Sequence, residues 1–225
     1  MDTHRCQDWR MRESPTRAWR GVSAEERNAE RRSRLIEAGI EVVGTEGWAR
    51  ATVRRVCEEA GLTVRYFYEN FEDVDALLVA VFEHVVDEGT AAVLTAFAEA
   101  EQRARARTHA AVSAAFTLFT ADSRRGRILL SEGSGNTALE TRRRRFINDA
   151  AGLLAQVALD HAGRAKPDPD DVRLTALAIV GAELQLATAF LAGDLDVPLD
   201  RVIDHVTQLH LAAAKVSSVA ARTAR

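Results

Sequence analysis

Five residues between positions 52 and 68 carry groups that suit contacts with a nucleic acid: Thr52, Thr63, Arg65, Tyr66 and Tyr68. The guanidinium of Arg65 can donate to both O6 and N7 of a guanine. A threonine hydroxyl at the start of a helix, beside free backbone N–H groups, suits a phosphate oxygen, and this is the position expected for Thr52. Tyr66 could contact either a base or a phosphate. These residue types at this spacing predict a surface that binds DNA.

Two short helices joined by a tight turn are expected to position these groups. Thr52 can cap a first helix and Thr63 a second one, from Val64 to Asn70. Between them, Gly61 can adopt the positive φ that ends a helix. Apolar residues spaced three and four apart give the first helix a buried face: Val53, Val56, Cys57 and Ala60. The pattern predicts a helix-turn-helix, whose second helix enters the major groove.

Here the sequence resembles the TetR family of bacterial transcriptional regulators. The resemblance covers residues 24 to 86 and rests on several motifs at fixed offsets: Gly44-Thr45-Glu46-Gly47-Trp48, Thr52-Val53, Val56, Ala60-Gly61, Phe67-Tyr68, Phe71 and Leu77-Leu78. It implies DNA contacts at seven positions: Thr52, Arg54, Thr63, Val64, Arg65, Tyr66 and Tyr68. In this family the tyrosine matched by Tyr68 commonly meets a phosphate.

Two residues depart from the family pattern. Val74 occupies a position where the family often has a lysine that contacts a phosphate, and Glu69 adds a negative charge to the second helix. Affinity for phosphates is therefore expected to depend on Arg50, Arg54, Arg55 and the amino-terminal segment. That segment contains Arg17 and Arg20, and it either reaches along the DNA or is a tail without a role in binding.

Composition describes a globular protein. The chain has 225 residues, of which 47% are hydrophobic and 28% charged, with a net charge of −3. No apolar run approaches the roughly 18 residues that a membrane span needs, and the first residues lack the apolar core of a secretory signal. Cys6 and Cys57 do not suggest a disulfide framework, so a cytoplasmic protein without contact to a membrane is expected.

An all-α chain with three parts is predicted. Residues 1–22 form a flexible arginine-rich arm, residues 23–72 a three-helix DNA-binding domain, and residues 73–225 a helical domain for ligand binding and dimerisation. A long helix is expected after Asp73. The apolar periodicity and the breaks between segments place further helices near 103–121, 124–132, 136–162, 170–192 and 199–219.

The last two predicted helices have apolar faces. In the TetR family the corresponding helices pair with their copies, so the resemblance implies a homodimer; alternatively these faces are buried within one chain. The expected interface residues are Leu177, Gly181, Leu184, Thr188, Val202, Val206 and Leu209. A two-fold dimer would match a palindromic operator in double-stranded DNA.

The resemblance also implies a pocket for an unknown small-molecule effector. Candidate lining residues are Phe97, Phe116, Phe119, Glu132, Phe146 and Glu183, with Leu129, Leu153 and Gln185. Apolar residues of this kind more often belong to the plain core, and the alternative for the polar ones is a position on the surface or in a dimer interface. We expect no cofactor and no metal. An enzyme is the alternative from another class, but the histidines are scattered and no nucleophile or phosphate-loop motif is present. A further alternative is an architectural DNA-binding protein that needs no ligand.

Overall fold

The structure is a computed structural model that describes residues 23–130, 136–162 and 167–223, with side chains in the last segment as far as residue 214. Every regular element in these ranges is a helix, which confirms the predicted all-α class. The predicted arm over residues 1–22 and the candidate pocket residue Glu132 lie outside the described residues.

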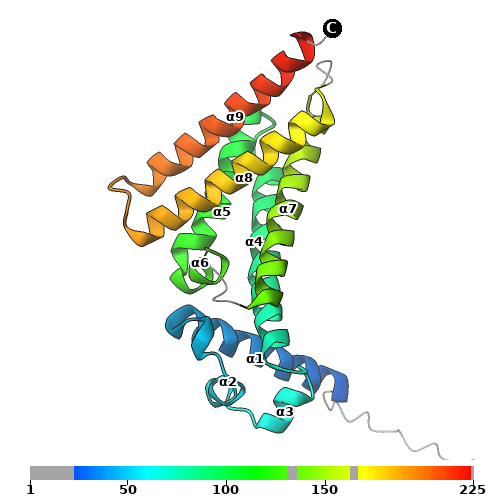
Figure 1. Cartoon of the computed structure of the whole chain (residues 1–225), viewed down its shortest axis with the longest axis vertical. Coiled ribbons are helices and arrows are strands. Elements are labelled where there is room, and N and C mark those ends of the chain that lie inside the picture. Colours follow the sequence, from blue (N-terminus) through cyan, green and yellow to red (C-terminus); the bar gives the residue numbers. More distant parts are fainter. Residues whose placement is uncertain (1–22, 131–135, 163–166, 224–225) are drawn as a thin grey trace, which may run out of the picture.

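The amino-terminal helices form a head, which is the lowest part of the molecule in Figure 1. The head contains α1 (Ala24–Glu46), a short 3₁₀ turn η1 (Trp48–Arg50), α2 (Val53–Ala60) and α3 (Val64–Tyr68). A capping box starts α1: Ser23 Oγ accepts from the Glu26 N–H at 3.0 Å, and the Glu26 carboxylate accepts from the Ser23 N–H at 2.6 Å. The sequence Ser23-Ala24-Glu25-Glu26 has the spacing of such a capping box.

The remaining helices form a body. They are α4 (Val74–Glu99), α5 (Ala104–Ala121), α6 (Ser123–Leu130), α7 (Thr137–Asp160), α8 (Pro169–Ala192) and α9 (Leu199–Thr223). The long helix α4 begins beside the head and runs up into the body, while α8 and α9 lie side by side and slant across its upper part (Figure 1). Asp73 caps α4, as predicted, because its carboxylate accepts from the Ala76 N–H at 2.8 Å.

One hydrophobic core continues from the head into the body. Leu35 of α1, Phe67 of α3 and Leu77 of α4 are fully buried in it. Gly39 lets α1 approach α4 closely, since a Cβ there would lie 2.5 Å from a methyl carbon of Val81. A second cluster joins α7 to α8 through small residues that include Ala151 and Ala176. The continuous core means that a shift of α4 must also displace the head.

The structure corrects two local predictions. Helix α3 ends at Tyr68 rather than at Asn70. Thr63 stands at the N-cap position of α3, but its side chain accepts no hydrogen bond there, so the hydroxyl does not cap the helix. Gly61 has φ of +62°, as expected for the residue that ends α2.

Helix α8 has an apolar surface that the other described residues leave uncovered. By length and composition alone, α8 is the one helix in the described ranges that could span a membrane: its most apolar window has a mean hydropathy of 1.7, and 22% of that window is buried. Leu174 is 66% exposed and Leu177 39% exposed. Exposed apolar residues grouped on one helix face are typical of interaction surfaces.

Candidate functional site

The two helices of the predicted motif divide into a buried back and an exposed front. The back consists of residues that the sequence assigned to the motif's own core: Val56, Cys57, Phe67 and Phe71 are buried, and Val53 and Leu62 pack partly against them. The front presents Thr63, Val64, Arg65 and Tyr68 to solvent. Of the seven predicted DNA-contacting residues, only Tyr66 is not exposed, because it is half-buried.

Arg65 is the most accessible base-reading candidate. Its side chain is 85% exposed, and its Nε donates to Glu69 Oε1 at 3.0 Å one turn along the helix. Glu69 also lies 3.8 Å from Arg31 of α1. An exposed pair of this kind is worth only about 0.3–0.5 kcal/mol. DNA could therefore take over the guanidinium of Arg65 at little cost.

The two tyrosines of α3 differ in how free they are. The guanidinium of Arg31 lies 4.6 Å from the centre of the Tyr66 ring, which keeps this ring against α1. Tyr68 is 59% exposed, and its ring packs edge-on against Phe67. The Tyr68 hydroxyl is thus presented at the surface.

At the start of α2, Thr52 accepts from the Arg55 N–H at 3.2 Å and keeps its own hydroxyl hydrogen for another acceptor. Arg54 is 89% exposed and pairs with Glu58 at 2.9 Å. Arg55 contacts Glu46 and Glu59, and its hydrogen bond to Glu46 raises its pKa. Arg55 is consequently less available to a phosphate than the sequence suggested, whereas Arg54 can be released easily.

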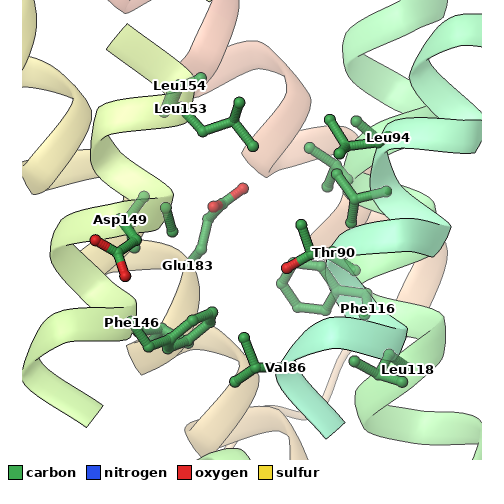
Figure 2. A pocket seen from close by; sticks show the side chains of 18 of the residues that line it. Val86, Thr90, Leu94, Phe116, Leu118, Phe146, Asp149, Leu153, Leu154 and Glu183 are labelled. Atoms are coloured by element: carbon green, nitrogen blue, oxygen red, sulfur yellow. The ribbon is translucent and has the colours of Figure 1, made fainter. Parts of the chain in front are cut away.

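The body contains a cavity of about 370 Å³ that is partly open to solvent and is lined mainly by α4, α5, α7 and α8. Five of the predicted pocket residues lie in the described ranges, and all of them line the cavity: Phe97, Phe116, Phe119, Phe146 and Glu183. Leu129 and Leu153 line it as well. Gln185 does not line the cavity and is exposed on α8. The exposure of two lining residues, Leu94 and Leu153, shows where the cavity meets solvent. Figure 2 shows these leucines at the upper edge of the cavity and Glu183 near its centre.

Sequence reasoning missed several polar residues of the lining, among them Thr90, Arg142, Asp149 and His210. Arg142 begins a run of four arginines, a pattern typical of a solvated helix surface, but its side chain is only 18% exposed and donates to Glu83 at 2.8 Å. A helical spacing of three and four residues relates Arg142 to Phe146, Asp149 and Leu153, and this periodicity could have revealed it.

The predicted interface residues fall into two groups. Leu177 and Leu209 are each 39% exposed, and a Cβ on Gly181 would meet no atom within 4 Å. Val202 and Val206, by contrast, are 4% and 1% exposed, because they pack into the core of their own chain. The prediction is wrong for these two valines. Leu184 and Thr188 are half-buried, and Leu184 also lines the cavity.

Helix α6 connects the cavity to the head. Leu129 lines the cavity, while Arg127 donates to the backbone carbonyls of Gly44 and Thr45 in α1, at 2.9 and 3.3 Å. Arg124 pairs with Glu41 of α1 and with Asp122. Arg125 joins Asp122 to Glu88 of α4. The hydrogen bonds from Arg124 and Arg125 hold the pKa of Asp122 well below its usual range, at about 2.

Comparison with known proteins supports this description. Residues 35–81 match the model of the family described as bacterial regulatory proteins, tetR family. Curated protein sequences give no match.

Three solved structures share the fold. The fatty acid degradation regulator FadR from Bacillus halodurans has a TM-score of 0.68 and 19% identity, with 80% of this chain and 94% of that chain covered. FadR from Bacillus subtilis in complex with stearoyl-CoA has a TM-score of 0.66 and 19% identity, with 80% and 98% covered. A TetR-like transcriptional regulator from a Rhodococcus species has a TM-score of 0.63 and 16% identity, with 81% and 94% covered.

The matched segment contains the whole helix-turn-helix and the first turns of α4, and the shared fold extends over the body. Residues 35–81 therefore carry the amino-terminal helix-turn-helix domain of the TetR family of bacterial regulatory proteins, and this domain forms the head.

Proposed function

We propose that this regulator is a repressor that binds a palindromic operator as a homodimer and is released from it by a small-molecule effector. Residues 23–72 would bind DNA in the cytoplasm, and residues 73–225 would bind the effector and the second copy. On the front of the head, Arg65 would read a base, whereas Thr52, Arg54 and Tyr68 would contact phosphates. Thr63, Val64 and Tyr66 complete the proposed contact surface.

The exposed apolar face of α8 supports the homodimer. Leu174, Leu177 and Gly181 follow one another at helical spacing, and all three are exposed in the single chain. A glycine allows a second helix to approach closely, and the flanking leucines supply apolar area. Two copies of one face satisfy a two-fold axis, which is the symmetry of a palindromic operator.

The cavity is the observation that carries the effector part of the proposal. Its volume of about 370 Å³ lies within the range of small-molecule sites, and most of its lining is apolar. Of the similar structures, FadR from Bacillus subtilis holds stearoyl-CoA, which supports a ligand here without identifying it. A ligand-independent architectural protein would have no need of such a cavity.

Helix α6 gives the cavity a physical connection to DNA. A ligand pressing on Leu129 would displace α6, and the hydrogen bonds of Arg124 and Arg127 would pass this movement to α1. Gly44 and Arg124 are so closely packed that a Cβ on the glycine would clash with the arginine. The two helices must therefore move together. A change in the angle of the two heads would alter their spacing on the operator.

Selection of bound sequences from random double-stranded DNA tests the DNA-binding part. We expect a two-fold symmetric site bound by two copies, and weaker binding of that site by Arg65→Ala. Enrichment of an asymmetric site bound by one copy would contradict the proposal.

Release is tested on the selected operator. Compounds that raise the melting temperature of the protein are added to the complex, and DNA binding is followed by fluorescence anisotropy. Compounds that occupy the cavity should weaken operator binding. If cavity ligands leave operator affinity unchanged, the architectural alternative is favoured.

A further inference from the structure

The charged residues that line the cavity include more carboxylates than permanent cations. Two carboxylates, Asp149 and Glu183, line the cavity, and Arg142 is the lining residue with a permanent positive charge. The Arg142 guanidinium is engaged with Glu83, which is not part of the lining, at 2.8 Å. Its charge is thereby compensated from outside the cavity, so the charge presented to a ligand is negative.

The carboxylate of Glu183 lies inside the cavity, where a bound ligand would meet it. Figure 2 shows its carboxylate projecting from α8 into the middle of the cavity. The side chain is 22% exposed, and Oε1 lies 2.7 Å from Nε2 of His210 in α9, whose side chain is 13% exposed. The other oxygen, Oε2, has no hydrogen-bond partner among the described residues. This oxygen is open to the cavity and can accept a hydrogen bond from a donor group on a ligand.

Asp149 is a second carboxylate in the lining. It lines the cavity from α7, is exposed, and has no hydrogen bond or ion pair from its side chain to any described residue. Among the described lining residues, the one arginine is Arg142, whose Nε is engaged with Glu83, so a carboxylate or phosphate on a ligand would meet Asp149 and Glu183 with little compensating charge. An anionic head group inside this cavity is therefore disfavoured.

The rings around Glu183 favour the opposite charge. Phe116 and Phe146 line opposite sides of the cavity below the Glu183 carboxylate in Figure 2. The faces of aromatic rings attract cations, and the attraction grows as water is excluded. The remaining lining is aliphatic and suits an apolar body of the ligand.

We propose that the ligand of this cavity is an apolar molecule that carries a protonated amine, with the ammonium group donating to Glu183 inside the cavity that Phe116 and Phe146 also line. This inference rests on the proposed function, in which the cavity is the effector site. The charge of such a ligand is opposite to that of stearoyl-CoA, the anionic ligand bound in FadR from Bacillus subtilis.

Three probes with one hydrocarbon chain test the proposal: dodecylamine, dodecanol and dodecanoate. Their binding to the purified full chain is measured by isothermal titration calorimetry at pH 7, below micelle-forming concentrations and without DNA. Dodecylamine should bind at least about tenfold more tightly than the other two, as expected for one charge-assisted hydrogen bond. Equal or tighter binding of dodecanoate, or no measurable binding of dodecylamine, would overturn the proposal.

Variants assign the preference to Glu183. Glu183→Gln should weaken dodecylamine about tenfold and change dodecanol by less than about twofold, since the amide keeps the shape but loses the charge. Glu183→Asp, which keeps the charge, should retain the preference for the amine. The matched control is Glu101→Gln, at an exposed glutamate outside the lining, and it should change nothing. If Glu183→Gln leaves the amine preference intact, Glu183 is not the receptor and the proposal fails.

The outcomes separate this inference from the proposed function. Tight dodecanol binding with no preference for the amine leaves the effector site in place and refutes only the charge assignment. If dodecylamine binds tightly but does not release the protein from the operator, the ligand class stands and the release mechanism is refuted.

Discussion

A single charge on the apolar face of α8 should separate the two copies of this regulator. We choose Gly181→Arg because Gly181 is exposed in the single chain and a Cβ there meets no atom within 4 Å. The arginine therefore fits on the monomer, and replacing glycine inside a helix favours the helix by up to about 1 kcal/mol. The fold of one chain should not suffer.

In the dimer the same arginine would be buried without a partner against an apolar face. An uncompensated buried charge costs about 3–5 kcal/mol. This converts to a dissociation constant raised about 100-fold to several thousand-fold. A dimer that is stable at micromolar concentration would become a monomer under the same conditions.

Light scattering after size-exclusion chromatography measures the effect over a range of concentrations. The unaltered chain should have about twice the monomer mass of 24.7 kDa, and Gly181→Arg should have the monomer mass. Ala92→Arg is the matched control: it adds the same charge at an exposed position of α4 and should remain dimeric. A monomeric unaltered chain, or a dimeric Gly181→Arg with unchanged affinity, would refute the reasoning.

Three further experiments test the head and its attachment to the body. Arg65→Ala should lose about 1–3 kcal/mol of binding free energy on the operator and should no longer discriminate one guanine in each half-site. Tyr68→Phe should weaken binding to the operator and to unrelated DNA equally, and by less than Arg65→Ala weakens binding to the operator. If Arg65→Ala weakens binding to all sequences equally, Arg65 contacts a phosphate rather than a base. Deletion of residues 1–20 should weaken DNA binding and flatten its salt dependence, because fewer counterions are released, and an unchanged slope would show that the arm does not bind. Asp122→Asn should lower the free energy of unfolding at pH 7 by about 1–2 kcal/mol, allowing for solvent screening, since the pKa of Asp122 falls from 3.8 to about 2 on folding. This stabilisation is present above about pH 4 and is lost as the pH falls toward 2, so denaturant titrations of the two proteins should converge there.

The helix-turn-helix could be read from the sequence because its determinants are local. A cap at Thr52, a glycine at 61 and apolar residues at helical spacing each act within a few residues of their position in the chain. Fixed offsets from these markers then placed Arg65 and Tyr68 on the exposed front. For the same reason, the helices of the body were predicted to within a few residues of their ends.

The cavity was partly within reach of the sequence. The aromatic residues and Glu183 could be proposed as its lining, since a lone carboxylate in an apolar helix is unusual. The sequence could not separate a residue that faces a cavity from one that fills a core, because both have the same periodicity. Only the packing of α4, α5, α7 and α8 distinguishes them.

The sequence by itself determined the fold class, the motif and most of the residues on the exposed front of the head. The tertiary structure alone decided which apolar face each helix turns inward. Val202 and Val206 have the composition of an interface, yet α9 packs them against its own chain, whereas Leu174 and Leu177 of α8 stay outside. It also gave Arg142 a partner 59 residues away in Glu83 and paired Glu183 with His210. Such pairs depend on how helices cross, and helix crossings are set by the packing of many side chains together rather than by any local stretch.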